Sequence, residues 1–246
     1  MATNELRQTL KRLRLSGLLA TLQDRVSYAK GVKLPYVEFL ELILQDEVQR
    51  REQNSLNKRM KYASLDSDQT LERFDWDAKV TVDRNTLKEL FSLEFIDRKE
   101  NVIFCGPVGV GKTFLANALA HSVCRRGKKV LMLRAHKIFK TLLQSRADNS
   151  FEKELIRFIS PDLLGIDDFG LQKLTHQEAN DFYEIVVERY GKASTIITSN
   201  RHIDEWGALF DDPILANSAL DRLAHNAYQL IIEGESYRKK FHLTGL

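Results

Sequence analysis

Eight residues near the middle of the chain limit its possible folds more than any other feature. They match the pattern G-x-x-x-x-G-K-[ST] in full, and they are Gly106, Pro107, Val108, Gly109, Val110, Gly111, Lys112 and Thr113. The apolar run NVIFC (101–105) precedes them and an apolar helical sequence follows. In this strand–loop–helix context, glycines let the backbone bend around phosphates and direct several N–H groups toward them. The pattern therefore predicts a phosphate-binding loop in an α/β fold.

The same pattern assigns chemistry to its last two residues. Lys112 is expected to reach the β- and γ-phosphates of ATP, and the Thr113 hydroxyl is expected to bind Mg²⁺. The N-terminus of the following helix adds a favourable partial positive charge. A glycine-rich turn with no ligand is the alternative, and the strand and helix on either side favour the nucleotide site.

Four more apolar segments follow the loop, separated by helical sequence. They are KKVLMLRA (128–135), DLLGID (162–167), STIITSN (194–200) and AYQLIIEG (227–234). Helices are expected at 112–126, up to about residue 160, and at 175–190, where Thr175 and Glu178 have the spacing of a capping box. Apolar strands that alternate with helices predict a five-stranded parallel sheet flanked by helices on both faces.

Polar residues end two of these segments. Asp167 and Asp168 close LLGIDD in a Walker B pattern. We expect Asp167 to hold Mg²⁺, directly or through water, and Asp168 to polarise the attacking water. Asp168 is shorter than the glutamate common at this position, so slow hydrolysis is expected. Asn200 is expected to orient that water beside the γ-phosphate. The alternatives are a turn at the end of the strand for the two aspartates and a cap on the following helix for Asn200.

Arg222 is a further catalytic candidate. In an isolated chain, the Asp221-Arg222 pair is only a surface pair. In an assembled ring or helix, Arg222 would reach the nucleotide of the neighbouring subunit, where an arginine supplied in trans raises the rate by roughly 10³–10⁵. A second basic group is either a track for a phosphate backbone or a solvated helix face, and it consists of Arg134, Lys137, Lys140 and Arg146.

The first 65 residues predict helices. Leucines recur at helical spacing, the pattern stops at Gly31 and Pro35, and an apolar stripe then resumes at Phe39, Leu40, Ile43, Leu44 and Val48. Residues 1–62 hold 12 Lys and Arg against 7 Asp and Glu, a net charge of +5, whereas the other 184 residues hold 25 against 27, a net charge of −2. This excess indicates either an anionic partner such as nucleic acid or a solvated helical surface.

We therefore expect three regions. Residues 1–65 would form a helical domain for contact with a partner or DNA, residues 66–100 a linker and helix, and residues 101–246 the ATPase domain. In the second region, Phe74 and Trp76 are expected anchors and residues 85–99 read as one amphipathic helix. The absence of a long uncharged apolar run argues against a membrane segment, and we expect no secretion signal, because the first residues lack an apolar core and a small-residue cleavage site. With only two cysteines, we expect a reducing cytoplasm.

Several of these motifs together resemble one family. GPVGVGKT, LLGIDDFG, STIITSN and ANSALDRLAHNAYQLIIEGESYR are similar to the IstB family, the ATP-dependent helpers of IstAB-type insertion sequences. That family is close to the DnaC-like helicase loaders among the AAA+ ATPases. PYVEFLELILQDEVQRRE and the FDW segment also resemble the family's helical region, so the resemblance covers nearly the whole chain.

The resemblance implies a role and a set of residues. Gly106 to Thr113 would bind phosphates, Asp167 would serve Mg²⁺, Asp168 would be the second acidic position, Asn200 the first sensor and Arg222 the arginine finger. The family binds ATP, assembles as a homo-oligomer on double-stranded DNA and presents it to a cognate transposase. DNA contact would be non-specific and made mainly to the phosphate backbone. Little sequence follows EGESYR, so no helical lid is expected, and Arg238 would partly replace a sensor carried by a lid.

Three other readings stay open at this stage. The first is a replicative helicase loader that acts on single-stranded DNA. The second is a small-molecule kinase that uses the same phosphate loop. In the third, ATP stabilises the oligomer at subunit interfaces with almost no hydrolysis.

Overall fold

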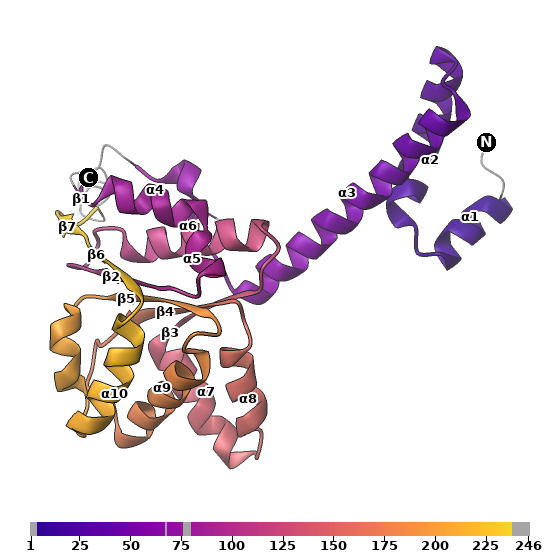
Figure 1. Ribbon diagram of the computed structural model, residues 1–246. Coiled ribbons are helices and arrows are strands. Elements are labelled where there is room, and N and C mark those ends of the chain that lie inside the picture. Colours follow the sequence, from indigo (N-terminus) through magenta and orange to yellow (C-terminus); the bar gives the residue numbers. More distant parts are fainter. Residues whose placement is uncertain (1–3, 67, 76–79, 238–246) are drawn as a thin grey trace, which may run out of the picture. The chain divides into compact units, whose positions relative to one another are not determined.

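The computed structural model describes residues 4–66, 68–75 and 80–237 (Figure 1). The chain divides into two compact units, Met1–Lys58 and Arg59–Leu246. Each unit is described by itself below. The division of the chain at 65 and 100 stays a prediction. Trp76, expected as an anchor of the second region, and Arg238, expected to replace in part a sensor carried by a lid, lie outside the described residues.

The first unit is helical, as expected. It contains α1 (Asn4–Arg12), α2 (Ser16–Val32) and most of α3 (Tyr36–Ala63), and the predicted interruption at Gly31 and Pro35 coincides with the end of α2 and the start of α3. A small core holds these helices together, formed by Leu10, Leu18, Leu22 and Ile43. The expected stripe on α3 is only partly buried, since Leu40, Leu44 and Val48 are each 52% exposed.

The second unit is built on a five-stranded sheet. Its strands are β2 (Asn101–Cys105), β3 (Val130–Arg134), β4 (Leu163–Phe169), β5 (Ser194–Ser199) and β6 (Ala227–Ile231). They lie in the order β3-β4-β5-β2-β6, and every neighbouring pair is parallel. The predicted parallel sheet is therefore confirmed, with each strand inside or within two residues of its predicted segment.

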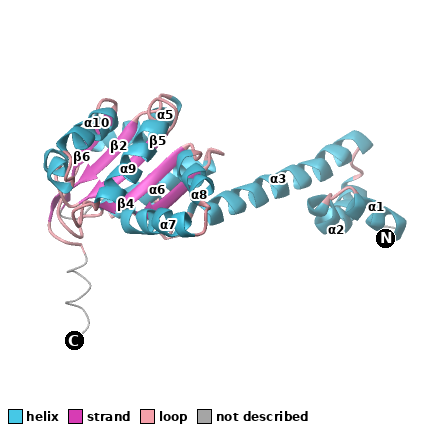
Figure 2. Ribbon diagram, turned by 90° about the horizontal axis from the view of Figure 1, so that it is seen from below, coloured by secondary structure: helices cyan, strands magenta, loops and turns pink. Residues whose placement is uncertain are grey.

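Helices cover both faces of this sheet (Figures 1 and 2). One face carries α6 (Lys112–Arg125) together with α4 (Arg84–Ser92) and α5 (Glu94–Asp97). The other carries α7 (Ala135–Ala147), α8 (Phe151–Ile159), α9 (His176–Arg189) and α10 (Pro213–Ala224). The predicted capping box is present, because the Thr175 side chain and Glu178 cap each other at the start of α9. Strands buried on both faces explain their continuous apolar sequence.

Sequence reasoning missed several local features. The single helix expected over 85–99 is broken into α4 and α5, because Leu93 adopts a left-handed conformation (φ 66°) while its side chain stays buried. Two 3₁₀ helices, η1 (Leu71–Arg73) and η2 (Ile203–Leu209), were not expected. Neither was the antiparallel pair of β1 (Val80–Thr81) and β7 (Glu233–Gly234). η1, β1 and β7, with two or three residues each, are too short to carry a periodic signal, and the seven-residue η2 has no α-helical spacing to indicate it.

Residues 232–237, the described part after β6, contain β7 and no helix. This agrees with the expectation of no helical lid over the stretch that the structure describes. Among the helices of the described residues, none is both long enough and apolar enough to cross a membrane.

Candidate nucleotide site

The order of the strands brings the predicted motifs together. β4, β5 and β2 are consecutive neighbours in the sheet. The carboxyl end of β2 leads into the loop at 106–111, Asp167 and Asp168 lie near the end of β4, and Asn200 follows β5. Because parallel strands end at the same edge, these segments from distant parts of the chain meet at one place. Ligand sites of open α/β sheets lie at this carboxyl edge.

Backbone conformation and close packing both require glycine in the loop. Gly106, Gly109 and Gly111 have φ values of 145°, 87° and 103°. A Cβ on Gly106 would lie 2.0 Å from the carbonyl oxygen of Ile232, and one on Gly109 would lie 2.1 Å from Ser236 Oγ. The segment after β6 therefore packs directly on the loop, and the Tyr237 amide donates a 2.9 Å hydrogen bond to the Gly109 carbonyl. The glycine pattern serves this packing as well as phosphate access.

Lys112 and Thr113 open helix α6 at the end of the loop. The Lys112 side chain is buried at 6% exposure, and its Nζ donates to the carbonyls of Gly106 and Pro107 at 2.7 Å each. Thr113 Oγ1 donates to Asp167 Oδ1 at 2.8 Å. This bond joins the loop of the first motif to the strand of the second. The N-terminus of α6 also lies at the loop, and its partial positive charge favours an anion there.

Asp167 has a second hydroxyl partner that sequence reasoning missed. Thr198 Oγ1, on β5, donates to Asp167 Oδ1 at 2.6 Å, and both residues are buried. The oxygen atoms of two hydroxyls and one carboxylate thus lie together beside the phosphate loop, and oxygen atoms are the ligands that Mg²⁺ prefers. The described residues contain no cluster of three or more His, Cys, Asp or Glu side chains for a metal. The set fits an ion held by one or two protein groups and by phosphate oxygens.

Asp168 sits in a strained backbone conformation. Its φ is 57°, a left-handed value that is uncommon for a residue other than glycine, and the pairing of β4 with β5 is irregular between Ile166 and Phe169. The Asp168 amide donates to Thr198 Oγ1 at 3.0 Å. Its carboxylate lies 3.9 Å from Arg134 Nε, at the end of β3. Asp168, like Asp167, lines the cavity described next.

A cavity of about 410 Å³ joins most of these residues. It is lined by six of the eight loop residues (Val108 to Thr113) and by Arg134, Asp167, Asp168 and Asn200. The segment before the sheet also contributes to the lining, through Gln69, Arg73, Phe74, Asp75 and Val80. Of these, only Phe74 was expected as an anchor, and its ring packs 5.6 Å from the Phe114 ring. The volume lies in the range of ligand pockets.

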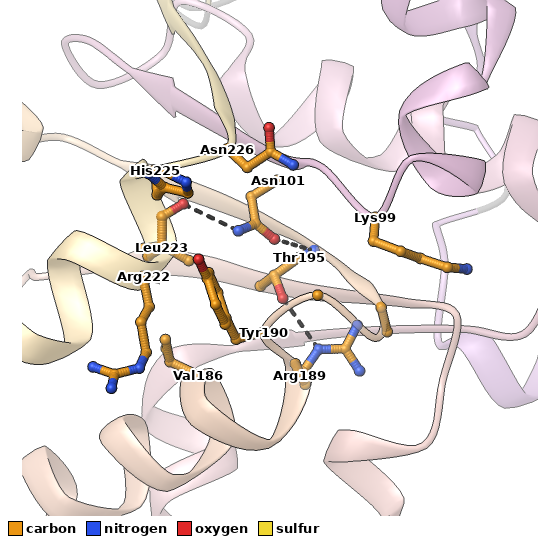
Figure 3. A pocket seen from close by; sticks show the side chains of 12 residues that line it. Lys99, Asn101, Val186, Arg189, Tyr190, Thr195, Arg222, Leu223, His225 and Asn226 are labelled. Atoms are coloured by element: carbon orange, nitrogen blue, oxygen red, sulfur yellow. Dashed lines mark hydrogen bonds between the residues drawn. The ribbon is translucent and has the colours of Figure 1, made fainter.

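Arg222 lies away from this cavity. It lines a second cavity of about 320 Å³ together with Asn101 and Thr195, which lie at the amino ends of β2 and β5 (Figure 3). Arg222 Nη1 donates to the Ser218 carbonyl at 2.7 Å and to Ser218 Oγ at 2.5 Å. Within one chain, the predicted arginine finger and the phosphate loop therefore face opposite edges of the sheet.

The basic residues around β3 and α7 separate into two groups. Arg134, Lys137 and Lys140 are exposed. Arg146 is not part of such a surface, because its guanidinium donates two hydrogen bonds to the buried Asp181 carboxylate and stacks 4.0 Å above the Phe151 ring. Of the two alternatives for this group, a phosphate track and a solvated helix face, Arg146 fits neither, since a buried carboxylate already neutralises its charge.

Cys105 packs in β2, as expected from its place in an apolar run. Burial raises the pKa of its thiol to about 11. At neutral pH the thiol is therefore protonated and a poor nucleophile.

Comparison with known proteins agrees with this site. The profile of the family described as "IstB-like ATP binding protein" matches residues 8–244. A Mycobacterium tuberculosis protein described as ATP-binding and encoded in an insertion sequence is 38% identical over 96% of this chain and 94% of its own length. The ATP-binding protein of insertion sequence IS21 from Pseudomonas aeruginosa is 38% identical over 96% of this chain and 89% of its own.

A solved structure shares the fold over about two thirds of this chain. The crystal structure of DnaI is similar with a TM-score of 0.58 at 21% identity, over 66% of this chain and 90% of that one. At this identity the likeness concerns the fold alone. The profile match over nearly the whole length, together with the two close relatives, shows the family. The chain is a member of the IstB-like ATP binding protein family.

Proposed function

We propose that this protein is an ATPase that serves a transposase. It binds ATP with Mg²⁺ at the carboxyl edge of the sheet, assembles as a homo-oligomer on double-stranded DNA and delivers that DNA to its cognate transposase. The observation that carries the proposal is the hydrogen bond from Thr113 to Asp167 beside the loop that holds Lys112. It links a phosphate-binding loop to an acidic strand end, the pair of features that nucleotide hydrolysis requires.

In this proposal each residue of the site has a task. The loop amides and Lys112 hold the β- and γ-phosphates, and Thr113 and Asp167 hold Mg²⁺. The ion would neutralise the charge that develops on the phosphates. Asp168 polarises the attacking water and Asn200 orients it. The Asp168 carboxylate is close to Arg134, and it is shorter than a glutamate, so turnover is slow and acts as a timer for DNA release.

The position of Arg222 supports an interface role. Because Arg222 faces the opposite edge of the sheet from the loop of its own chain, it contributes to catalysis only at the nucleotide of another subunit. An oligomer in which the carboxyl edge of one subunit meets the amino edge of the next has this head-to-tail form. Hydrolysis then depends on assembly.

Exposed cations favour DNA as the anionic partner. Arg134, Lys137 and Lys140 form a basic surface beside the nucleotide cavity, and the first 62 residues carry a net charge of +5. Contacts to phosphates give non-specific, salt-sensitive binding. The insertion-sequence relatives favour a transposase as the protein partner over a replicative helicase. The likeness to DnaI concerns fold and leaves loading of a helicase onto single-stranded DNA as the second candidate.

Titration calorimetry with ATP and Mg²⁺ tests the nucleotide site. We expect saturable binding by the unchanged protein and loss of binding in Lys112→Ala, with Lys137→Ala as a control that removes an exposed lysine. An unchanged protein with no affinity for ATP would overturn the proposal.

Electron microscopy with a non-hydrolysable ATP analogue tests the assembly. We expect ordered oligomers on duplex DNA that disperse when ATP is supplied and hydrolysed. Ordered assembly on single-stranded DNA alone would favour the helicase-loader reading. An assembly that stays on the DNA while ATP is hydrolysed would show that ATP stabilises the oligomer and does not time its release.

A further inference from the structure

The pairing of β4 with β5 is interrupted beside the nucleotide cavity. It is irregular between Ile166 and Phe169, the stretch that contains Asp168. Asn200 follows directly after β5, and both Asp168 and Asn200 line the cavity. Regular sheet hydrogen bonds therefore do not fix the distance between these two residues, and other groups must do so.

The Asn200 side chain is not held by hydrogen bonds of its own. No described residue donates to it or accepts from it. Its direction therefore depends on the backbone on either side, at Ser199 and Arg201. Both of these neighbours are bonded to the turn that follows Asp168.

Ser199 makes the first of these links. Its Oγ is buried and donates to the Phe169 carbonyl at 2.8 Å, and it accepts from the Arg201 amide at 3.1 Å. Phe169 comes directly after Asp168, and its ring stacks on Phe182 with 4.6 Å between the ring centroids. One hydroxyl thus joins the backbone around Asn200 to a well-packed part of β4.

Arg201 makes the second link. Its Nε donates to the Gly170 carbonyl at 2.8 Å. Gly170 has a φ of 77°, and a Cβ there would lie 3.7 Å from Arg201 Cδ, so the arginine stem packs over this turn. The Arg201 backbone is also fixed, because Nε1 of the buried Trp206 donates to its carbonyl at 3.3 Å. The side chain therefore reaches Gly170 from a fixed position.

We propose that Arg201 is a positioning residue that holds Asn200 at a set distance from Asp168, so that both engage the same water molecule. This inference rests on the proposed function, in which Asp168 polarises that water and Asn200 orients it. The bond from Arg201 to Gly170 joins the two strand ends where the regular pairing is interrupted. Misplacing reacting groups by about 1 Å costs on the order of 10²-fold in rate.

Turnover and ATP affinity, measured separately on the full chain, test this role. Arg201→Met keeps an apolar stem but cannot donate to the Gly170 carbonyl. With saturating ATP, Mg²⁺ and duplex DNA, we expect its turnover to fall about tenfold while the ATP dissociation constant from calorimetry changes by less than about twofold. Arg201→Lys keeps a donor in a different geometry, and its turnover should fall only about threefold.

Arg126→Met is the matched control. The Arg126 side chain is 45% exposed, as is that of Arg201, and both lie near a carboxylate, Asp97 and Glu205 respectively. Arg126 also donates to a backbone carbonyl, that of Ser92 at 2.9 Å, but it lies at the end of α6, outside the nucleotide cavity. We expect normal turnover in this variant. Thermal unfolding without nucleotide shows whether each variant is folded.

A second background shows whether Arg201 acts through Asn200. Single-turnover rates remain measurable when hydrolysis is slow, so they are compared for Asn200→Ala with and without Arg201→Met. In this background, Arg201→Met should change the rate by less than about twofold, because the side chain that it positions is already absent.

The outcomes separate this inference from the proposed function. Normal turnover in Arg201→Met, or an equal loss in Arg126→Met, would overturn the role of Arg201. A parallel loss of ATP affinity would make Arg201 a nucleotide ligand, and a full tenfold loss in the Asn200→Ala background would show that it acts elsewhere. Each of these also overturns the inference. Failure of the unchanged protein to bind ATP would remove the proposed function itself.

Discussion

At the scale of single residues, Asp168 combines strain with a proposed task. An L-residue at φ 57° suffers a steric penalty that glycine does not. The structure retains an aspartate there, with its amide bonded to Thr198 and its carboxylate near Arg134. Strain of this kind is common where a side chain must be aimed at a ligand.

Comparison of Asp168→Gly with Asp168→Ala separates backbone strain from chemistry. Both variants should bind ATP and lose turnover, because both lack the carboxylate. Asp168→Gly should be the more stable by about 1 kcal/mol, or roughly 2–4 °C in melting temperature, since glycine tolerates the left-handed conformation. Calorimetric melting and steady-state ATPase assays measure the two effects. Equal melting temperatures would show that the backbone stores no strain here.

Thr198 offers a second test, because its hydroxyl is bonded to both acidic positions. Thr198→Val keeps the shape of the side chain, but it leaves the Asp168 amide without its acceptor and Asp167 with one hydroxyl fewer. We expect turnover to fall about tenfold and stability to fall by about 1–2 kcal/mol. Thr198→Ser restores the hydroxyl and should recover most of both. If Thr198→Val turned over ATP at the normal rate, the hydroxyl would have no part in arranging the site.

At the scale of secondary-structure elements, α2 and α3 are joined by an unusual cap. No side chain of α2 caps its own N-terminus. Instead Glu47, on α3, accepts hydrogen bonds from the amides of Gly17 at 2.7 Å and Leu18 at 3.2 Å. A Cβ on Gly17 would lie 2.8 Å from the Asp46 carbonyl oxygen and 2.9 Å from Glu47 Cα. Close approach of the two helices therefore requires glycine, and it lets a carboxylate satisfy the helix N-terminus.

Two alanine substitutions on α2 should change the stability of the helix pair in opposite directions. Gly17→Ala should destabilise the helix pair by about 1–3 kcal/mol, because the new methyl group meets backbone atoms. Gly31→Ala, where a Cβ meets nothing within 4 Å, should stabilise it by about 0.5–1 kcal/mol. Hydrogen exchange of residues 16–58 in the full chain reports both. If Gly17→Ala left the hydrogen-exchange protection of these residues unchanged, α2 and α3 would be able to move apart there at no cost in stability.

The same helix pair should weaken in acid. Hydrogen bonds from Arg25 and Thr21 lower the pKa of Asp46 below its usual value. The folded carboxylate therefore resists protonation, so its contribution is complete above the unfolded pKa near 3.9 and is lost as the pH falls through the lower folded value. Asp46→Asn should reduce protection of residues 16–58 about fivefold at pH 7. The difference from the unchanged protein should shrink as the pH falls below the unfolded pKa, and a difference that did not change with pH would exclude ionisation of Asp46 as its source.

At the scale of the whole molecule, the two cavities lie at opposite edges of one sheet. The phosphate loop and Asp167 line the first, and Arg222 lines the second. A single subunit cannot bring them together without unfolding the sheet. Complete catalytic sites would then exist only between subunits.

Mixing two inactive variants tests this directly. The Lys112→Ala variant cannot hold the phosphates but still has Arg222. The Arg222→Ala variant has an intact phosphate loop but no arginine to supply to its neighbour. Each alone should be inactive, whereas an equal mixture should contain complete sites at about a quarter of its interfaces and recover turnover in proportion. A double variant, Lys112→Ala with Arg222→Ala, is the control for mixing. An Arg222→Ala protein that hydrolyses ATP normally by itself would contradict a site shared between subunits.

Local sequence was sufficient to predict much of this protein. The strand–loop–helix context of Lys112, the five apolar runs, the capping box at Thr175 and the helix break at Pro35 all involve residues within a few positions of one another. Backbone sterics, hydrophobic periodicity and hydrogen bonds to near neighbours act over that range. The acidic pair at Asp167 and Asp168 was found in the same way, from its place at a strand end.

Tertiary structure decided what distant segments do together. Strand order placed Thr198 against Asp167, and packing of residues 232–236 on the loop added a second reason for Gly106 and Gly109. It also set Arg222 at the far edge of the sheet and paired Arg146 with the buried Asp181 carboxylate. Each of these depends on contacts between residues far apart in the chain. Such contacts arise from burial of whole elements, which no short window of sequence encodes.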